Sequence, residues 1–229
     1  MPARNIIKVY SENSFYHIYN RGVEKRIIFK DEQDYGVFLG YLKEYLSPPE
    51  DFSKYKKIVT FKGETFKGVP RVPNNYSKEI ELLVYCLMPN HFHFIVKQYP
   101  DRSIQNFVRS LCTRYSMYFN KRYTRVGSLF QGPYKAVLVN NEEYLLHLSR
   151  YIHQNPEELN INLAKAHSSY PEYIGERKTE WVKTDLILSF FNKATESFVR
   201  GFNTYKNFVE GSEINSSEIL GKMILEPPL

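Results

Sequence analysis

Residues 81–97 constrain the fold of this chain more than any other segment. They read ELLVYCLM, then Pro-Asn, then HFHFIVK, which are two apolar, β-prone runs of strand length joined by a tight turn. Such a pair of runs predicts an antiparallel hairpin, because strands joined by two residues pair with each other. We therefore expect an antiparallel sheet at the centre of the fold.

The segments on either side of this hairpin complete an order of elements. Their periodicity and capping residues predict a strand over residues 14–20, a helix capped by Asp31 and running to about Leu46, a helix capped by Ser103 and running to about Lys121, a strand over 135–139, and a helix capped by Asn141 that ends before Pro156. The order β-α-β-β-α-β followed by a helix indicates an α+β, ferredoxin-like fold, with helices on one face of an antiparallel sheet.

The length of 229 residues allows one domain with an appendage. We expect a first domain over residues 1–165, with a polar, Lys-rich insertion at 48–79 that contains a small hairpin around Ile58–Phe66. Residues 166–229 are expected to form a C-terminal helical extension, with helices from Trp181 to about Phe191 and from Glu196 to about Glu210.

Charge and aromatic content indicate a nucleic-acid partner. The formal net charge is +6, and the chain has 19 Tyr and 16 Phe. Phosphates attract Lys and Arg, and bases stack on aromatic rings, although a Tyr-rich core under a mildly basic surface explains the same totals. The two cysteines are expected to be buried free thiols. The chain shows neither a signal-peptide pattern nor an apolar run long enough to span a bilayer, so we expect a cytoplasmic protein.

The positive charge is concentrated in one stretch, from Lys97 to Lys135. This stretch has one acidic residue, Asp101, and eight basic ones: Lys97, Arg102, Arg109, Arg114, Lys121, Arg122, Arg125 and Lys135. Tyr and Phe residues are interleaved with them. The pattern is a candidate phosphate-binding groove with stacking rings, and the alternative is a solvated basic helix face.

The residues that could bind a metal or act as a nucleophile lie on the hairpin and on the helix after Asn141. His91 and His93 are two apart on a predicted strand, so both side chains leave the same face and make half of a metal site; the alternative is two hydrogen-bonded histidines. Tyr151 and Asn155 are one helical turn apart, on a stripe that also includes His147, whereas His153 should face elsewhere. Helical spacing alone does not distinguish Tyr151 from an ordinary core tyrosine.

Five segments together resemble the single-tyrosine HUH transposases, in particular the REP-associated tyrosine transposase branch. They are FYHIYNRG, LMPNHFHFIVK, RYSMYFNKRY, SLFQGPYKAVLV and EEYLLHLSRYIHQNP. The resemblance covers roughly residues 14–165 apart from the insertion at 48–79, and it implies that residues 1–165 are an HUH catalytic domain. It also implies that His91, His93 and Asn155 bind a divalent metal ion, Mg²⁺ or Mn²⁺, and that Tyr151 is the nucleophile.

The resemblance further implies a transposase that cleaves and rejoins single-stranded DNA near hairpins through a 5′-phosphotyrosine. Two cleavages then need a homodimer or successive reactions. The residues expected to hold the DNA backbone are Arg21 and, within the basic stretch, Arg102, Arg109, Arg114, Lys121, Arg122, Arg125 and Lys135. The alternatives are a domesticated, non-catalytic nucleic-acid-binding protein on the same scaffold, and a metallohydrolase in which His147 assists the histidine pair.

Overall fold

The computed structural model describes residues 10–49, 57–61, 63–68, 74–192, 201–211 and 220. Its centre is a four-stranded sheet in the order β4-β5-β1-β6, with every neighbouring pair antiparallel. The strands are β1 (Ser14–Arg21), β4 (Ile80–Met88), β5 (His91–Gln98) and β6 (Lys135–Val139). Together with two helices they give the order β1-α1-β4-β5-α2-β6. The predicted ferredoxin-like fold and its central hairpin are therefore confirmed.

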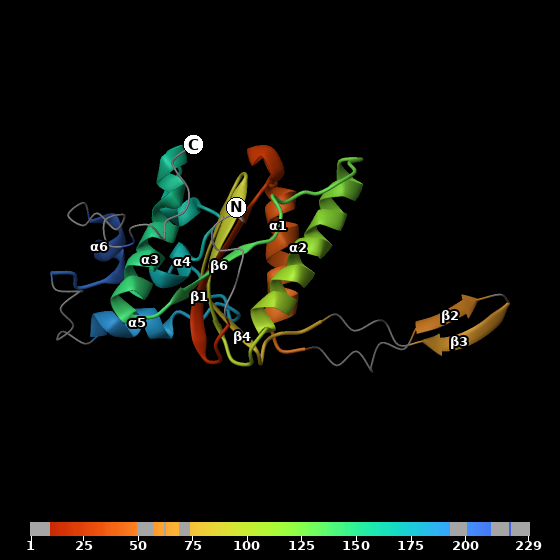
Figure 1. The fold of residues 1–229 in the computed structure, drawn as a ribbon, viewed down its shortest axis with the longest axis horizontal. Helices are drawn as coiled ribbons and strands as arrows, with labels where there is room; N and C mark the ends of the chain where they lie inside the picture. Colours follow the sequence, from red (N-terminus) through yellow and green to blue (C-terminus); the bar gives the residue numbers. More distant parts are fainter. Residues whose placement is uncertain are drawn as a thin grey trace.

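Helices α1 (Glu32–Leu46) and α2 (Ser103–Arg122) cover one face of the sheet (Figure 1). The side chain of Asp31 accepts hydrogen bonds from two backbone N–H groups at the start of α1, as the sequence predicts. Apolar side chains of both helices pack on Phe92 and Phe94 of β5 in one large cluster. Burial of the apolar and aromatic side chains of this cluster stabilises the packing of the two helices on the sheet.

The start of α2 differs from the prediction, because Ser103 is not its cap. Arg102 precedes the helix in the left-handed region, with φ 60°, and makes no side-chain capping bond. The Ser103 hydroxyl donates to a Glu79 carboxylate oxygen at 3.0 Å. The backbone N–H of Ile104 instead donates to the side-chain oxygen of Gln98, at the end of β5. Gln98 of a neighbouring strand thus satisfies one of the N–H groups that the first turn of a helix leaves without a partner in the helix.

Helix α3 (Glu142–Gln154) lies on the opposite face of the sheet, and Asn141 caps it through a 2.6 Å bond from the backbone N–H of Tyr144. It packs there with α4 (Tyr170–Tyr173), α5 (Asp185–Asn192) and α6 (Tyr205–Glu210), so helices cover both faces (Figure 1). Short 3₁₀ turns occur at Val23–Lys25, Asn155–Leu159 and Leu163–Lys165. The sheet therefore separates two hydrophobic clusters.

The C-terminal extension differs in detail from the prediction. Trp181 is not helical: its ring stacks on Tyr85 of β4 at 5.7 Å, and Val182 forms a β-bridge with Leu82. Helix α5 begins only at Asp185. Of the helix expected over 196–210, residues 196–200 lie outside the described residues, and the helix that is described, α6, starts after Thr204, which caps it. The division at residue 165 stays a prediction.

The insertion contains the predicted hairpin, formed by β2 (Lys57–Phe61) and β3 (Glu64–Gly68), which projects away from the body of the molecule (Figure 1). Cys86 is a buried free thiol and Cys112 a partly buried one. Among the described residues, no helix has the length and apolarity needed to cross a membrane.

Candidate active site

His91 and His93 leave the face of β5 that is opposite to Phe92 and Phe94, as the alternation of a strand requires. Their ring centroids lie 5.0 Å apart, and both side chains are buried, with 7% and 3% of their surface exposed. The predicted pairing of the two imidazoles on one face is therefore confirmed, and it occurs in a site that excludes most water.

The side chain of Asn90 orients His91. Nδ1 of His91 lies 2.6 Å from the Asn90 amide oxygen, which can only accept, so Nδ1 carries the proton and Nε2 keeps its lone pair. Burial lowers the pKa of His91 to about 4; a hydrogen bond to the Asn155 side chain opposes this effect, and the charge of Arg21 adds to it. His91 is thus a neutral imidazole at physiological pH, which is the state that ligates metals.

His93 has one bonded and one unbonded ring nitrogen. Its Nδ1 lies 2.9 Å from Nε2 of His17, on the neighbouring strand β1. Its Nε2 is buried and has no hydrogen-bond partner within the described part of the chain. Burial holds the pKa of His93 well below its ordinary value, and the nearby His91 and His17 rings add to that. A buried, neutral nitrogen with no partner is costly unless something binds it.

Helix α3 brings Tyr151 and Asn155 to this pair. The ring of Tyr151 lies 6.3 Å from that of His93, edge to face. Asn155, at the C-terminal end of α3, is 5% exposed, and its amide nitrogen donates to the backbone oxygen of Tyr151 at 2.8 Å. This bond orients the Asn155 amide, whose side chain also contacts His91. The four residues singled out from the sequence therefore meet in one place.

The other two histidines of α3 face elsewhere. His153 is fully buried, and its two nitrogens bond to the Tyr205 hydroxyl at 2.6 Å and the Ser169 hydroxyl at 2.8 Å, so the prediction that it faces away is confirmed. His147 packs against Phe208 of α6, with ring centroids 5.3 Å apart. Within the described part of the chain, no group of three or more His, Cys, Asp or Glu side chains is arranged to hold a metal. Nothing here favours a metallohydrolase in which His147 assists.

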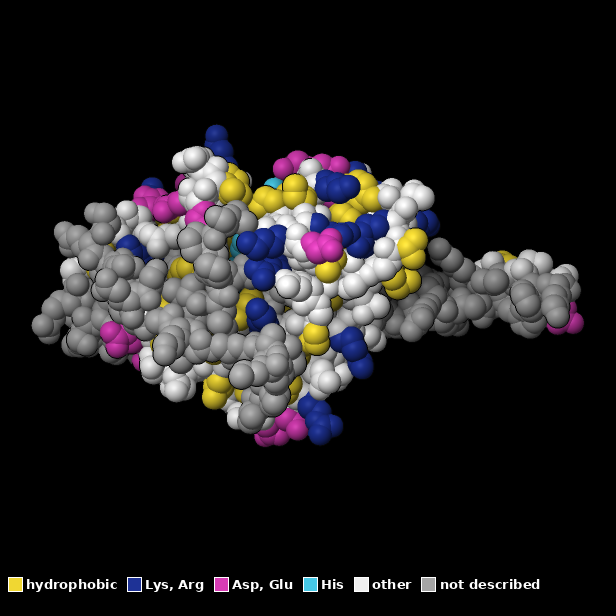
Figure 2. Space-filling view, turned by 45° about the horizontal axis from the view of Figure 1, so that its top comes forward, with side chains coloured by type: hydrophobic (Ala, Val, Ile, Leu, Met, Phe, Trp, Pro, Cys, Tyr) yellow, Lys and Arg dark blue, Asp and Glu magenta, His cyan; other side chains and the backbone are white. Residues whose placement is uncertain are grey.

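The predicted DNA-binding residues fall into three groups, and the first flanks the histidines. Arg21 lies opposite His91 in the β1–β5 register. Lys135 places its ammonium group 5.3 Å over the ring of Tyr19, and that ring stacks on His93. Figure 2 shows Lys and Arg side chains gathered across the middle of one face, where only small parts of histidine side chains reach the surface. Positive charge therefore borders the buried site.

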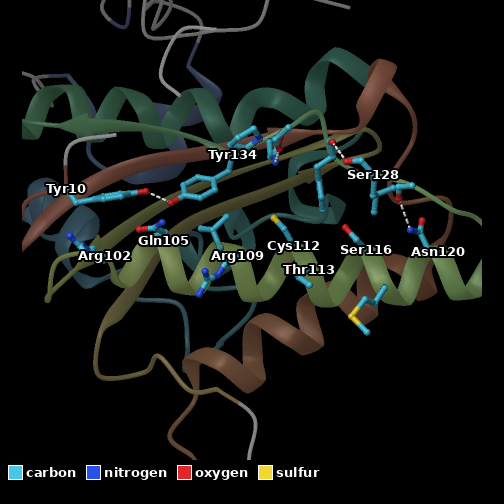
Figure 3. A pocket seen from close by; sticks show the side chains of 18 residues that line it. Tyr10, Arg102, Gln105, Arg109, Cys112, Thr113, Ser116, Asn120, Ser128 and Tyr134 are labelled. Carbon is cyan, nitrogen blue, oxygen red and sulfur yellow. Dashed lines mark hydrogen bonds between the residues drawn. The ribbon is translucent and has the colours of Figure 1, made fainter. Parts of the chain in front are cut away.

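The second group, Arg102 and Arg109, lines a groove of about 950 Å³ between α2 and the loop before β6. Figure 3 shows polar side chains of α2 along one wall and Tyr134, hydrogen-bonded to Tyr10, on the other. Asn20 of β1 also lines it. Because Asn20 and Arg21 point to opposite faces of β1, this groove lies on the α2 side of the sheet, away from the histidines.

The third group consists of Lys121 and three arginines whose guanidinium groups bond within the protein. The Arg114 guanidinium pairs with both carboxylate oxygens of Glu44 at 2.8 Å. Arg122 bonds to the carboxylates of Asp31 and Asp34. Arg125 donates to the Asn120 side chain and to backbone carbonyls of its own loop. Lys121 is exposed near the end of α2. These arginines stabilise the packing of α1 on α2 and the loop after α2. A count of charges along the sequence does not reveal that role.

Sequence reasoning missed two residues at the site, His17 and Asn90. Asn90 adjoins His91 but reads as a turn residue in PN. His17 lies in the alternating run FYHIYN, so its side chain leaves the same face of the strand as that of Tyr19. Tyr19 is the residue paired with His93. Only the strand register would have identified it, since the two histidines are far apart in sequence.

These features define a class: a ferredoxin-like sheet whose inner strand carries two buried histidines beside a helix-borne tyrosine. Residues 53–155 match the sequence model of the family described as "Transposase IS200 like". The matched segment contains His91, His93, Tyr151 and Asn155. The family resemblance that the sequence motifs indicate is therefore confirmed.

Two solved structures are similar to the chain. One is described as the structure of the REP-associated tyrosine transposase bound to a REP hairpin, with 10% identity, a TM-score of 0.48, and coverage of 77% of this chain and 95% of that one. The other is a candidate transposase from Deinococcus radiodurans R1, with 15% identity, a TM-score of 0.35, and coverage of 65% and 95%. No curated protein matches the chain.

Proposed function

We propose that this chain is a metal-dependent transposase that cleaves and rejoins single-stranded DNA near hairpins, with Tyr151 as the nucleophile. The observation that carries the proposal is the buried Nε2 of His93, which no described residue hydrogen-bonds and which lies beside His91, Asn155 and the Tyr151 ring. Two neutral imidazoles and an amide oxygen can provide three ligands for a divalent cation, and the choice of Mn²⁺ or Mg²⁺ rests on the resemblance of the sequence motifs. The preference for hairpins rests on the resemblance of the sequence motifs.

His91, His93 and Asn155 would hold the cation. When bound, it supplies charge neutralisation for the scissile phosphate. Tyr151 attacks the phosphorus: its hydroxyl oxygen forms a phosphate ester, the bond to the 3′ oxygen breaks, and that oxygen leaves as a hydroxyl. Tyrosine has an ordinary pKa near 10, so its proton must be removed for the attack; Tyr151 is partly exposed, which leaves a route for the proton to solvent. One phosphate ester replaces another, so rejoining needs no ATP.

All four residues belong to one chain, and the Tyr151 and His93 rings contact each other within it. We infer that one copy makes one cleavage with its own tyrosine. A transposition needs two cleavages, which a homodimer or successive reactions of one copy would provide. We assign DNA-backbone binding to Arg21 and Lys135 beside the site and to Arg102 and Arg109 in the groove.

The test is incubation of the full chain with Mn²⁺ and a panel of hairpin-bearing single-stranded oligonucleotides. We expect an SDS-resistant adduct whose peptide mass maps to Tyr151. The adduct should disappear in Tyr151→Phe, which keeps the ring and removes only the hydroxyl, while binding persists. His91→Ala should abolish metal-dependent cleavage.

Two outcomes would reject the proposal. An adduct that survives Tyr151→Phe would assign the chemistry to another residue. Tight binding of the oligonucleotides by the wild type without any adduct or cleavage, across the panel and with either metal, would favour the non-catalytic nucleic-acid-binding protein.

A further inference from the structure

His17 lies in the sheet beside the candidate metal site, on strand β1. It is 1% exposed, and its ring stacks on that of His93 with centroids 5.1 Å apart and planes 20° apart. The residue directly opposite His93 in the register is Tyr19, so His17 reaches His93 diagonally, from two residues further along the same face. Its Nε2 lies 2.9 Å from Nδ1 of His93, which makes a direct hydrogen bond between the two rings.

This hydrogen bond has two arrangements, because a neutral imidazole carries one N–H and one lone pair. In the first, His93 donates from Nδ1 to Nε2 of His17, and His93 keeps a lone pair on Nε2. In the second, His17 donates and Nε2 of His93 carries a hydrogen. A metal ion needs the lone pair, so only the first arrangement makes Nε2 of His93 a ligand.

The surroundings of the pair do not select between these arrangements by hydrogen bonding. Nδ1 of His17 and Nε2 of His93 are both buried, and neither has a hydrogen-bond partner among the residues that the structure describes. Each arrangement therefore leaves one buried donor and one buried acceptor unsatisfied. A cation on Nε2 of His93 satisfies the acceptor in the first arrangement only, so binding and the orientation of the hydrogen bond favour each other.

We propose that His17 is a positioning residue, which accepts the Nδ1 hydrogen of His93 and thereby fixes Nε2 of His93 as the metal-ligating nitrogen. The inference rests on the proposed function, since it requires the metal site. Its role parallels that of Asn90, whose amide oxygen accepts from Nδ1 of His91. The two histidine ligands would then each be oriented by an acceptor on Nδ1, one next to it in sequence and one on the adjacent strand.

The test compares two variants of the full chain. His17→Phe keeps a buried ring and removes the acceptor, whereas His17→Gln keeps an acceptor at a similar reach. We expect His17→Phe to weaken Mn²⁺ binding by roughly 10–100-fold, the usual effect of losing such a partner, and His17→Gln to bind within a few-fold of wild type. Mn²⁺ affinity is measured by titration with electron paramagnetic resonance, after thermal unfolding has shown both variants to be folded.

A second measurement needs no variant. Proton–nitrogen correlation spectra of histidine-labelled wild type, saturated with Mg²⁺, report which nitrogen of His93 carries the hydrogen. We expect Nδ1. Wild-type Mn²⁺ affinity in His17→Phe, or a hydrogen on Nε2 of His93, would overturn the role of His17. The control His91→Ala tests the site itself: if that variant keeps wild-type Mn²⁺ affinity, the metal site and the role of His17 both fall, whereas a loss in His91→Ala without a loss in His17→Phe refutes only the latter.

Discussion

The histidine in the YIHQNP segment, His153, should affect acid stability and not chemistry. Burial lowers its pKa from 6.5 to about 3, and both of its nitrogens are bonded to hydroxyl groups of the surrounding core. The folded protein therefore keeps His153 neutral, while the unfolded chain binds a proton below pH 6.5. Because the unfolded state binds more protons between these two pKa values, stability is lost as the pH falls from about 6.5 toward 3.

The size of this effect follows from the two pKa values. At pH 4.5 the unfolded chain has gained nearly a full proton at His153 and the folded protein almost none, which costs about 2.5 kcal/mol relative to pH 7. In His153→Gln, which retains hydrogen-bonding capacity without a titratable group, the loss of stability between pH 7 and pH 4.5 should be smaller by that amount. With a urea m-value of about 2.5 kcal/mol per M, the pH-dependent shift in midpoint should be about 1 M smaller than in wild type.

Urea unfolding of wild type and variant at both pH values measures this difference, and the other buried histidines cancel in the comparison. The variant should also keep wild-type Mn²⁺ affinity and adduct formation at pH 7. If the stability of the two proteins depended equally on pH, the conclusion that burial lowers the pKa of His153 would be refuted. Loss of Mn²⁺ binding in the folded variant would instead show that His153, and not only Asn155, serves the metal site.

Three further predictions concern the supports of the site. Arg109→Ala should reduce the slope of log affinity for single-stranded DNA against log salt by about one, because Arg109 lines the groove. Arg122→Ala should instead lower the thermal midpoint of unfolding, because Arg122 pairs with carboxylates at the start of α1. A reduced salt slope in Arg122→Ala but not in Arg109→Ala would show that the DNA does not lie in this groove. Arg150→Met should lower the free energy of unfolding by about 2 kcal/mol, since the buried guanidinium donates to the backbone carbonyls of Val209, in α6, and of Gly211, directly after it; unchanged urea unfolding would contradict this. Gly22→Ala should cost about 1–3 kcal/mol, because a Cβ there would lie 2.2 Å from a backbone oxygen. In the control Gly36→Ala, the Cβ meets no described atom within 4 Å, so this change should be neutral or stabilising.

The elements of the fold were predictable where local signals agree with tertiary packing. The 81–97 hairpin and the Asp31 and Asn141 caps follow from the sequence because apolar runs and capping side chains act on their near neighbours. The prediction that Ser103 caps its helix was wrong, because its hydroxyl bonds to Glu79 of another segment and the helix begins at Ser103 itself. The sequence predicts that an apolar helix begins at Trp181. In the structure, Trp181 lies before that helix, and its ring stacks on Tyr85 in the core.

The site was predictable in part for the same reason. Strand and helix periods place His91 with His93 and Tyr151 with Asn155, but joining the two pairs required the resemblance to a family. Interactions between residues distant in sequence could not be predicted from the sequence. Arg114 and Glu44 are 70 residues apart, and Arg122 and Asp34 are 88 apart, so a count of charge along the chain cannot separate arginines that bind carboxylates from those that face a ligand.

The groove and the histidines lie on opposite faces of the sheet, yet backbone hydrogen bonds connect them. The loop that forms one wall of the groove is bonded to the end of β1, through Gln131 to Arg21 at 2.8 Å and through a bridge between Phe130 and Gly22. The N–H of Gly22 in turn donates to the backbone oxygen of Asn90, whose side chain orients His91.

A shift of this loop on binding DNA would therefore reach His91 through backbone contacts at the end of β1, where Gly22 has no room for a side chain. Rigid, closely packed segments transmit such displacements, whereas loose ones absorb them. The tight turn at Gly22 is thus expected to couple occupancy of the groove to the geometry of the candidate metal site. If it does, a single-stranded oligonucleotide too short to reach Tyr151 will still change Mn²⁺ affinity in wild type but not in a folded Gly22→Ala variant.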